Sequence, residues 1–284
     1  MTTMRIRRNH AIAIAAGTFL ITSCNLDVQA GILTASVGSN WSCGIPVDGG
    51  GPGSLQLDAP SGSVHVSFSS GYTTYDEDNI ADGSYLGGGF ANARYGALRS
   101  TISFGTENAS CNFNTTSSSA SFDDTLIVNN LAGTGFMQIT FDVEGGIYTA
   151  DGAVADGNVV FDAVLNGTLS RLNITGDGEH GEAFQTALVP ITFGQEIDFR
   201  ASLALTLDHT TFFDIHHDGS AQIDFGNSAN FERISVFDDN MNLIDANDYT
   251  LTSGSGTDYS QPIPAPGVFM AVGLGGLIAL RRRK

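Results

Sequence analysis

Hydrophobic and polar residues alternate along most of the chain between residues 31 and 260. The clearest run places hydrophobic side chains at every second position from Ile197 to Leu207. Because the side chains of a β-strand point alternately to opposite faces, this run predicts a strand with one buried face. The same alternation predicts strands around residues 64–68, 137–143, 159–165, 221–225 and 231–238.

Clusters of glycine, aspartate and asparagine lie between or beside these runs and predict turns. They include Gly145-Gly146, Asp156-Gly157-Asn158 and Asp218-Gly219. The low-complexity residues 115–121 predict either a loop or a polar edge strand. No convincing pair of helix start and stop signals occurs between residues 31 and 260. The sequence therefore predicts an all-β domain, an antiparallel β-sandwich or jelly-roll-like fold.

The first 30 residues are typical of a secretory signal peptide. Three arginines precede an apolar run at residues 11–22, which is too short to span a bilayer comfortably. Small or branched residues then predict cleavage by signal peptidase between Ala30 and Gly31. The alternative is lipidation of Cys24, because the residues before it are similar to a bacterial lipobox.

The last residues combine three features that predict a membrane anchor. Pro264-Ala265-Pro266 precedes an apolar segment at residues 268–280, and Arg281-Arg282-Arg283-Lys284 ends the chain. The apolar segment alone would form a helix about 20 Å long, which is short for a membrane span. By the positive-inside rule, the basic cluster would stay in the cytoplasm and the folded domain outside.

This tripartite tail resembles the PEP-CTERM sorting signal of exported bacterial proteins, with Ala265 in place of the central glutamate. The resemblance implies recognition by an exosortase, a membrane enzyme similar to cysteine transpeptidases. It implies cleavage near Pro264, Ala265 and Pro266, and hence only transient anchoring in the membrane. An inner-membrane intermediate would precede delivery to the cell surface or the extracellular space. The family is associated with bacteria that make exopolysaccharide.

Loose motifs between residues 75 and 260 resemble a recurrent group of PEP-CTERM proteins. They begin with Tyr95-Gly96-Ala97-Leu98 and end with Asp224-Phe225-Gly226-Asn227-Ser228-Ala229. The group has no established catalytic residues, so the resemblance implies none here. The predicted organisation is a signal peptide at 1–30, a β-sandwich domain at 31–260 and a sorting tail at 261–284.

The net charge becomes more negative when the residues of the two signals are excluded. The 284-residue chain has a net charge of −18, and seven of its twelve basic residues lie in the two signals. Residues 31–260 hold five arginines against 29 acids, which gives a net charge of −24. Such a domain repels nucleic acid and anionic membranes, and it meets acidic polysaccharide only through a bridging cation.

Cys43 and Cys111 are the cysteines that remain after cleavage at Ala30. Because export favours oxidation, we expect them to form a disulfide. In the chain-entropy model such a bridge contributes about 4 kcal/mol if it is unstrained.

Acidic turn clusters are candidates for calcium binding. Asp238, Asn240 and Asn242 have the spacing of an EF-hand loop, but Leu243 and Tyr249 replace its glycine and its last acid. The cluster is therefore no EF-hand, and a solvated hairpin turn is the favoured interpretation. Calcium stays a weak candidate as a cofactor.

Signals for catalysis are sparse. His209, His216 and His217 lie near aspartates, but adjacent histidines on a strand point to opposite faces, so at most one joins a given site. Neither the Gly-x-Ser-x-Gly elbow nor the His-Glu-x-x-His zinc motif occurs. Trp41 is the only tryptophan, and sugar platforms usually use more aromatic residues.

The leading hypothesis from the sequence is a non-enzymatic, exosortase-sorted surface or matrix protein of a bacterium that makes exopolysaccharide. The first alternative is a carbohydrate-binding β-sandwich module, with or without calcium. A weaker alternative is a hydrolase that acts on matrix glycans. Under the leading hypothesis, the partners of the protein would be signal peptidase, the exosortase and extracellular polysaccharide. The protein would bind no nucleic acid.

Overall fold

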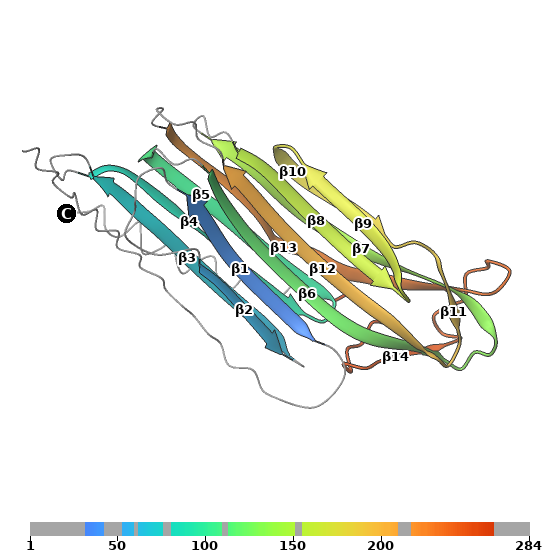
Figure 1. Ribbon diagram of the computed structural model, residues 1–284. Helices are drawn as coiled ribbons and strands as arrows, with labels where there is room; N and C mark the ends of the chain where they lie inside the picture. Colours follow the sequence, from blue (N-terminus) through green and yellow to red (C-terminus); the bar gives the residue numbers. More distant parts are fainter. Residues whose placement is uncertain are drawn as a thin grey trace, which may run out of the picture.

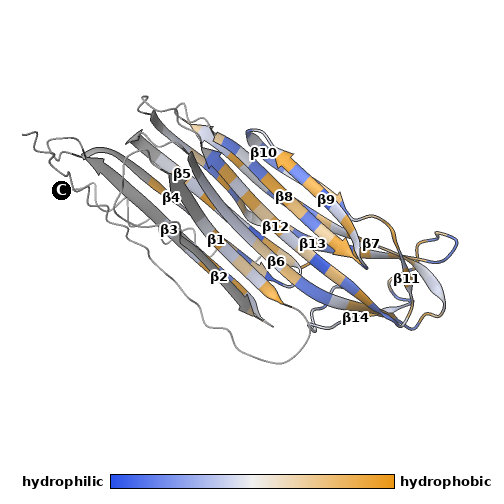
Figure 2. Cartoon of the chain, in the orientation of Figure 1, coloured by the Kyte–Doolittle hydropathy of each residue, from blue (hydrophilic) through white to orange (hydrophobic). Residues whose placement is uncertain are grey.

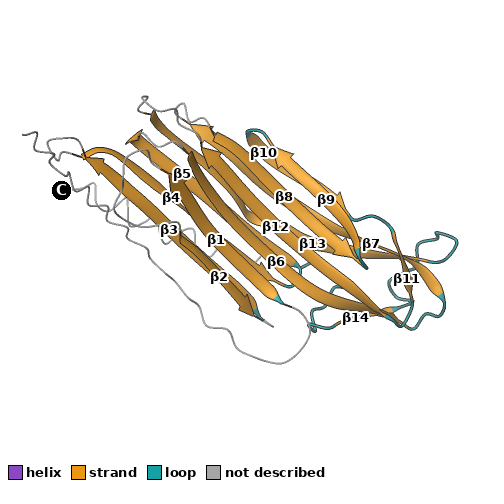
Figure 3. Cartoon of the chain, viewed as in Figure 1, coloured by secondary structure: helices purple, strands orange, loops and turns teal. Residues whose placement is uncertain are grey.

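The computed structural model describes residues 32–42, 53–59, 62–75, 81–109, 113–150, 155–209 and 217–263. In these ranges the chain forms two antiparallel β-sheets that pack face to face (Figure 1). The described residues include no helix (Figure 3). The predicted all-β sandwich is thereby confirmed.

Sheet I has the strand order β2-β1-β6-β12-β8-β9, and β14 also pairs with β6. Its strands are β1 (Leu33–Ser42), β2 (Gly53–Ala59), β6 (Phe113–Asn129), β8 (Ala155–Leu165), β9 (Thr168–Thr175), β12 (Glu196–His209) and β14 (Thr250–Ser253). Sheet II has the order β10-β7-β13-β5-β4-β3, and β11 also pairs with β7. Its strands are β3 (Ser63–Tyr75), β4 (Ala81–Arg94), β5 (Ala97–Ala109), β7 (Thr134–Ala150), β10 (Gly178–Gln185), β11 (Val189–Thr192) and β13 (His217–Phe237).

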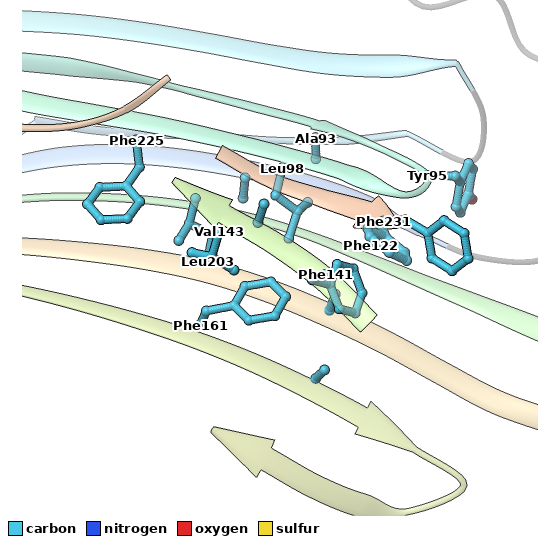
Figure 4. Close-up of a cluster of buried hydrophobic side chains, with 14 of the residues drawn as sticks. Ala93, Tyr95, Leu98, Phe122, Phe141, Val143, Phe161, Leu203, Phe225 and Phe231 are labelled. Atoms are coloured by element: carbon cyan, nitrogen blue, oxygen red, sulfur yellow. The ribbon is translucent and has the colours of Figure 1, made fainter. Parts of the chain in front are cut away.

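The core fills the space between the two sheets, and hydrophobic and polar positions alternate along the strands around it (Figure 2). Phe141 of sheet II lies fully buried at its centre (Figure 4). Its ring centroid is 4.9 Å from that of Phe161 and 6.1 Å from that of Phe199, both of sheet I. These tilted and edge-to-face contacts join the sheets and add to the free energy of burying the rings.

The predicted strands are confirmed, but two of them are parts of one strand. The runs at 221–225 and 231–238 both belong to β13, whose pairing with β5 shifts register between Phe225 and Ala229. A β-bulge accommodates extra residues while the strand continues. The polar residues between the two runs are therefore a bulge in a strand.

The three glycine clusters predicted as turns lie inside strands, so those predictions are wrong. A Cβ on Gly145 in β7 would come within 2.5 Å of the Phe225 ring, and one on Gly157 in β8 within 2.7 Å of Ile147. Gly219 adjoins a register shift in β13. At these positions glycine permits close packing or a bulge, and the chain does not reverse.

The low-complexity residues 115–121 lie in β6, between β1 and β12 at the centre of sheet I. The expectation of a loop or an edge strand is therefore wrong. The small inward side chain of Ser118 lies 2.5 Å from the Ser100 hydroxyl of sheet II and donates to the Phe90 carbonyl oxygen at 2.8 Å. These bonds satisfy the buried hydroxyls and bridge the two sheets.

The chain does reverse direction at a turn where the backbone has positive φ values. Asn166 and Gly167 have φ values of 45° and 79° between β8 and β9. This is the backbone of a two-residue hairpin, for which Asn-Gly between alternating runs is the strongest short-range signal.

Candidate functional site

A buried carboxylate fastens the C-terminal part of the domain to sheet I. Asp124 occupies an inward-facing position of β6 and is only 4% exposed. Its Oδ1 accepts hydrogen bonds from the backbone N–H groups of Thr125 at 2.8 Å and Ser255 at 2.9 Å. Its Oδ2 accepts from the Ser255 hydroxyl at 2.5 Å and the Tyr259 hydroxyl at 3.0 Å. We call Asp124, Ser255 and Tyr259 the Asp124 clasp.

The electrostatics of the Asp124 clasp keep its phenol protonated. Burial, followed by the nearby Asp124 carboxylate, raises the pKa of Tyr259 far above its ordinary value. Burial, with smaller contributions from Asp124 and Asp123, raises the pKa of the neighbouring Tyr95 to about 12. Tyr259 therefore stays a hydrogen-bond donor at neutral pH, and the filled shell of Asp124 suits a structural tie better than proton transfer.

The segment that the Asp124 clasp holds extends to Ile263, the last described residue. The Ile263 N–H donates to the Phe231 carbonyl oxygen at 3.1 Å, and the Ile263 side chain packs against the core. It covers Gly96 in the β4–β5 turn, where a Cβ would come within 2.1 Å of it. Gly96 also has a φ of 76°, so glycine is favoured there for two reasons.

The residues predicted for export, for sorting and for the disulfide lie outside the described ranges. This holds for Cys24, Ala30, Gly31, Cys43, Cys111, the motif at Pro264, Ala265 and Pro266, and the cluster from Arg281 to Lys284. In the described part of the chain, no helix is long and apolar enough to cross a membrane. The motif nevertheless follows the docked Ile263 directly in the sequence.

The calcium candidates form a hairpin turn after β13. The Oδ1 of Asp238 accepts from the backbone N–H groups of Asn240 at 2.9 Å and Asn242 at 2.8 Å, and its Oδ2 accepts from the Asn242 side chain at 2.9 Å. These bonds, above all those from Asn242, lower the pKa of Asp238. Both carboxylate oxygens of Asp238 therefore hold the turn.

We expect calcium to have no effect on folding through this turn, because a bound cation would compete with the hydrogen bonds that shape it. The melting temperature of the full chain should be equal in millimolar calcium and in EDTA. Differential scanning calorimetry measures this. If the melting temperature is higher in calcium than in EDTA, and Asp238→Asn abolishes this difference, the turn is a cation site.

The predicted histidine cluster is only partly described. His209 ends β12 and His217 begins β13, while His216 lies outside the described ranges. Among the residues that the structure describes, no group of three His, Cys, Asp or Glu side chains is placed to hold a metal ion.

A trough lies on the outer face of sheet II, over the middle of β4. Its volume is about 390 Å³, and Gly87, Gly88 and Gly89 are among the residues that line it. Register places Ser69 of β3 and Ser103 of β5 on either side of Gly88. Leu86, which is 65% exposed, lies beside Gly105 at one end.

Phe90 is the next outward-facing residue of β4 beyond the trough. Its ring centroid lies 5.8 Å from that of His65, and its ring reaches toward Gly226 in the β13 bulge. Burial lowers the pKa of His65, so this aromatic end favours the neutral imidazole.

Sequence reasoning missed both the Asp124 clasp and the trough, although each left a signal. Asp124 is an acid at a position where the alternation from Phe122 to Val128 requires a buried side chain, and acids are rarely buried without partners. The three consecutive glycines at 87–89 interrupt an otherwise strand-like segment, which indicates a bulge or a close approach to the backbone.

Comparisons with known proteins supply no family for this chain. No protein-family model matches it, and no curated protein is found as a relative. One solved structure that aligns with it is described as "Structural basis for the promiscuous specificity of the carbohydrate-binding modules from the beta-sandwich super family". The identity is 8%, the alignment covers 79% of this chain and 99% of the other, and the TM-score is 0.11. A likeness at this level carries no argument about ligand or function.

Proposed function

We propose that this is an exported, non-enzymatic β-sandwich protein that an exosortase sorts to the surface or matrix of a bacterium that makes exopolysaccharide. The observation that carries the proposal is the fastening of residues 253–263 directly before the Pro264-Ala265-Pro266 motif. Removal of the tail at the motif would leave the Asp124 clasp and the docked Ile263 in place, because their contacts described above are made by residues that precede Pro264.

The contacts of three acidic side chains, those of Asp124, Asp162 and Asp238, are those of structural residues. Asp162 binds Arg171 at 2.7 Å, Asp124 binds the C-terminal segment, and Asp238 holds a turn. A glycosidase needs two carboxylates that face a common substrate and are free to exchange protons. These carboxylates are instead committed to structural bonds.

Deletion of Arg281 to Lys284 is expected to stop tail processing, because the basic cluster holds the end of the tail at the cytoplasmic side. Wild-type protein recovered from the producing cell should lack residues after the motif, while the deletion variant should retain them. Mass spectrometry of the mature C-terminus measures both.

The matched control replaces the three arginines by lysines (Arg281→Lys, Arg282→Lys and Arg283→Lys), which keeps the charge. This variant should be processed like the wild type. A mature wild-type protein that still carries residues 268–284 would overturn the sorting proposal.

Carbohydrate binding is a second candidate function, and the trough on sheet II favours it. Pockets for small ligands usually occupy roughly 300–1,000 Å³, a range that includes this trough.

A further inference from the structure

The trough on sheet II is lined by two outward-facing positions that carry no side chain, Gly88 of β4 and Gly105 of β5. Ser69, Gly88 and Ser103 lie abreast on three neighbouring strands. Since neighbouring strands are about 4.8 Å apart, the two serines are separated by about 10 Å. The trough thus has a floor of backbone and Cα–H groups, with a hydroxyl on each side.

The lining of the trough selects an uncharged ligand. It consists of glycine, serine, Leu86 and Phe104, with no ionisable side chain among them. Residues 31–260 carry a net charge of −24, so long-range repulsion from the domain as a whole disfavours a polyanion. A cationic ligand would find no carboxylate in the lining.

The backbone pairing argues against an extended peptide as the ligand. Peptides that add to a sheet bind at an edge through free N–H and C=O groups. At the trough, β4 is paired with β3 on one side and with β5 on the other, so its backbone groups are used within the sheet.

We propose that the trough binds a chain of a neutral polysaccharide. A sugar ring presents C–H groups on its face and hydroxyls at its edge. The C–H face would lie on Gly88 and beside the exposed Leu86, and the hydroxyls would exchange hydrogen bonds with Ser69 and Ser103. This inference rests on the proposed export, because only an exported protein meets such a polymer.

Gly105→Leu tests the proposal. A Cβ at Gly105 would have no atom within 4 Å, so the position has room for a side chain, and a leucine there would extend into the trough beside Leu86. The matched control is Gly181→Leu, which lies on β10 at the opposite edge of the same sheet and also has open space.

The measurement is affinity electrophoresis of the purified full chain in gels that contain dextran, hydroxyethylcellulose, mannan or alginate. We expect at least one neutral polymer to retard the wild type and Gly181→Leu equally. Gly105→Leu should bind that polymer about tenfold more weakly, and alginate should retard none of the three. Equal circular dichroism spectra and melting temperatures would show that the variants are folded.

Three outcomes would overturn the proposal. They are no retardation by any neutral polymer, equal retardation of Gly105→Leu and the wild type, or retardation by alginate alone. Because the purified chain is used, the result does not depend on tail processing. Retardation by a neutral polymer together with an uncleaved tail in the cell would retain this inference and refute the sorting proposal.

Discussion

Phe141→Ala is expected to lower the free energy of unfolding by about 4 kcal/mol, the usual cost of removing a buried aromatic ring. Phe141 is fully buried, and it contacts Phe161 and Phe199 of sheet I as well as Phe231 of its own sheet. Removing its ring opens a cavity between the sheets and breaks several ring contacts at once. Urea unfolding followed by circular dichroism measures the loss.

The control for this variant is Leu169→Ala. Leu169 is a large hydrophobic residue of β9 but is 53% exposed, so its replacement should change stability by no more than about 0.5 kcal/mol. Equal stabilities of the two variants would contradict the placement of Phe141 at the centre of the sandwich.

Asp124→Ala is expected to cost about 3 kcal/mol, because it leaves buried hydrogen-bond donors without an acceptor. The hydroxyl of Tyr259, a residue only 2% exposed, would lose Asp124 as its hydrogen-bond acceptor, and the backbone N–H of Ser255 would lose the same acceptor. We also expect residues 250–263 to detach first, since Asp124 contacts them directly. Limited proteolysis with mapping of the early cuts measures this local effect.

Tyr259→Phe provides a graded comparison. It removes one donor from the Asp124 clasp but keeps the ring contacts with Phe199 and Phe231, so we expect a loss of about 1 kcal/mol. If Asp124→Ala unfolds at the same urea concentration as the wild type, or if its first cuts lie far from residues 250–263, the structural role of the clasp is refuted.

The strands were predictable because their signal is local. The alternation from Ile197 to Leu207 reports one buried face, and β12 has that face in the structure. The same local signal failed at residues 115–121. Serine and threonine have no strong preference for a face, and only the neighbouring strands β1 and β12 place this segment at the centre of sheet I.

The glycines show the same limit of prediction from local sequence. Glycine tolerates a turn, a bulge and close packing equally well, so its presence does not say which of these occurs. At Gly145 the ring of Phe225, some eighty residues later in the sequence, takes the space of a side chain. At Gly105 the space stays open and forms part of the trough.

The sequence by itself determined an acidic, all-β chain with strands at predictable places, because composition and two-residue periodicity need no knowledge of distant neighbours. It also supports the hypothesis of export and sorting, because such signals are linear. Only the tertiary structure decided which strands are central, what the inward-facing Asp124 binds and where missing side chains leave a trough. The physical reason is that each of these depends on partners brought together across the sandwich from distant parts of the chain.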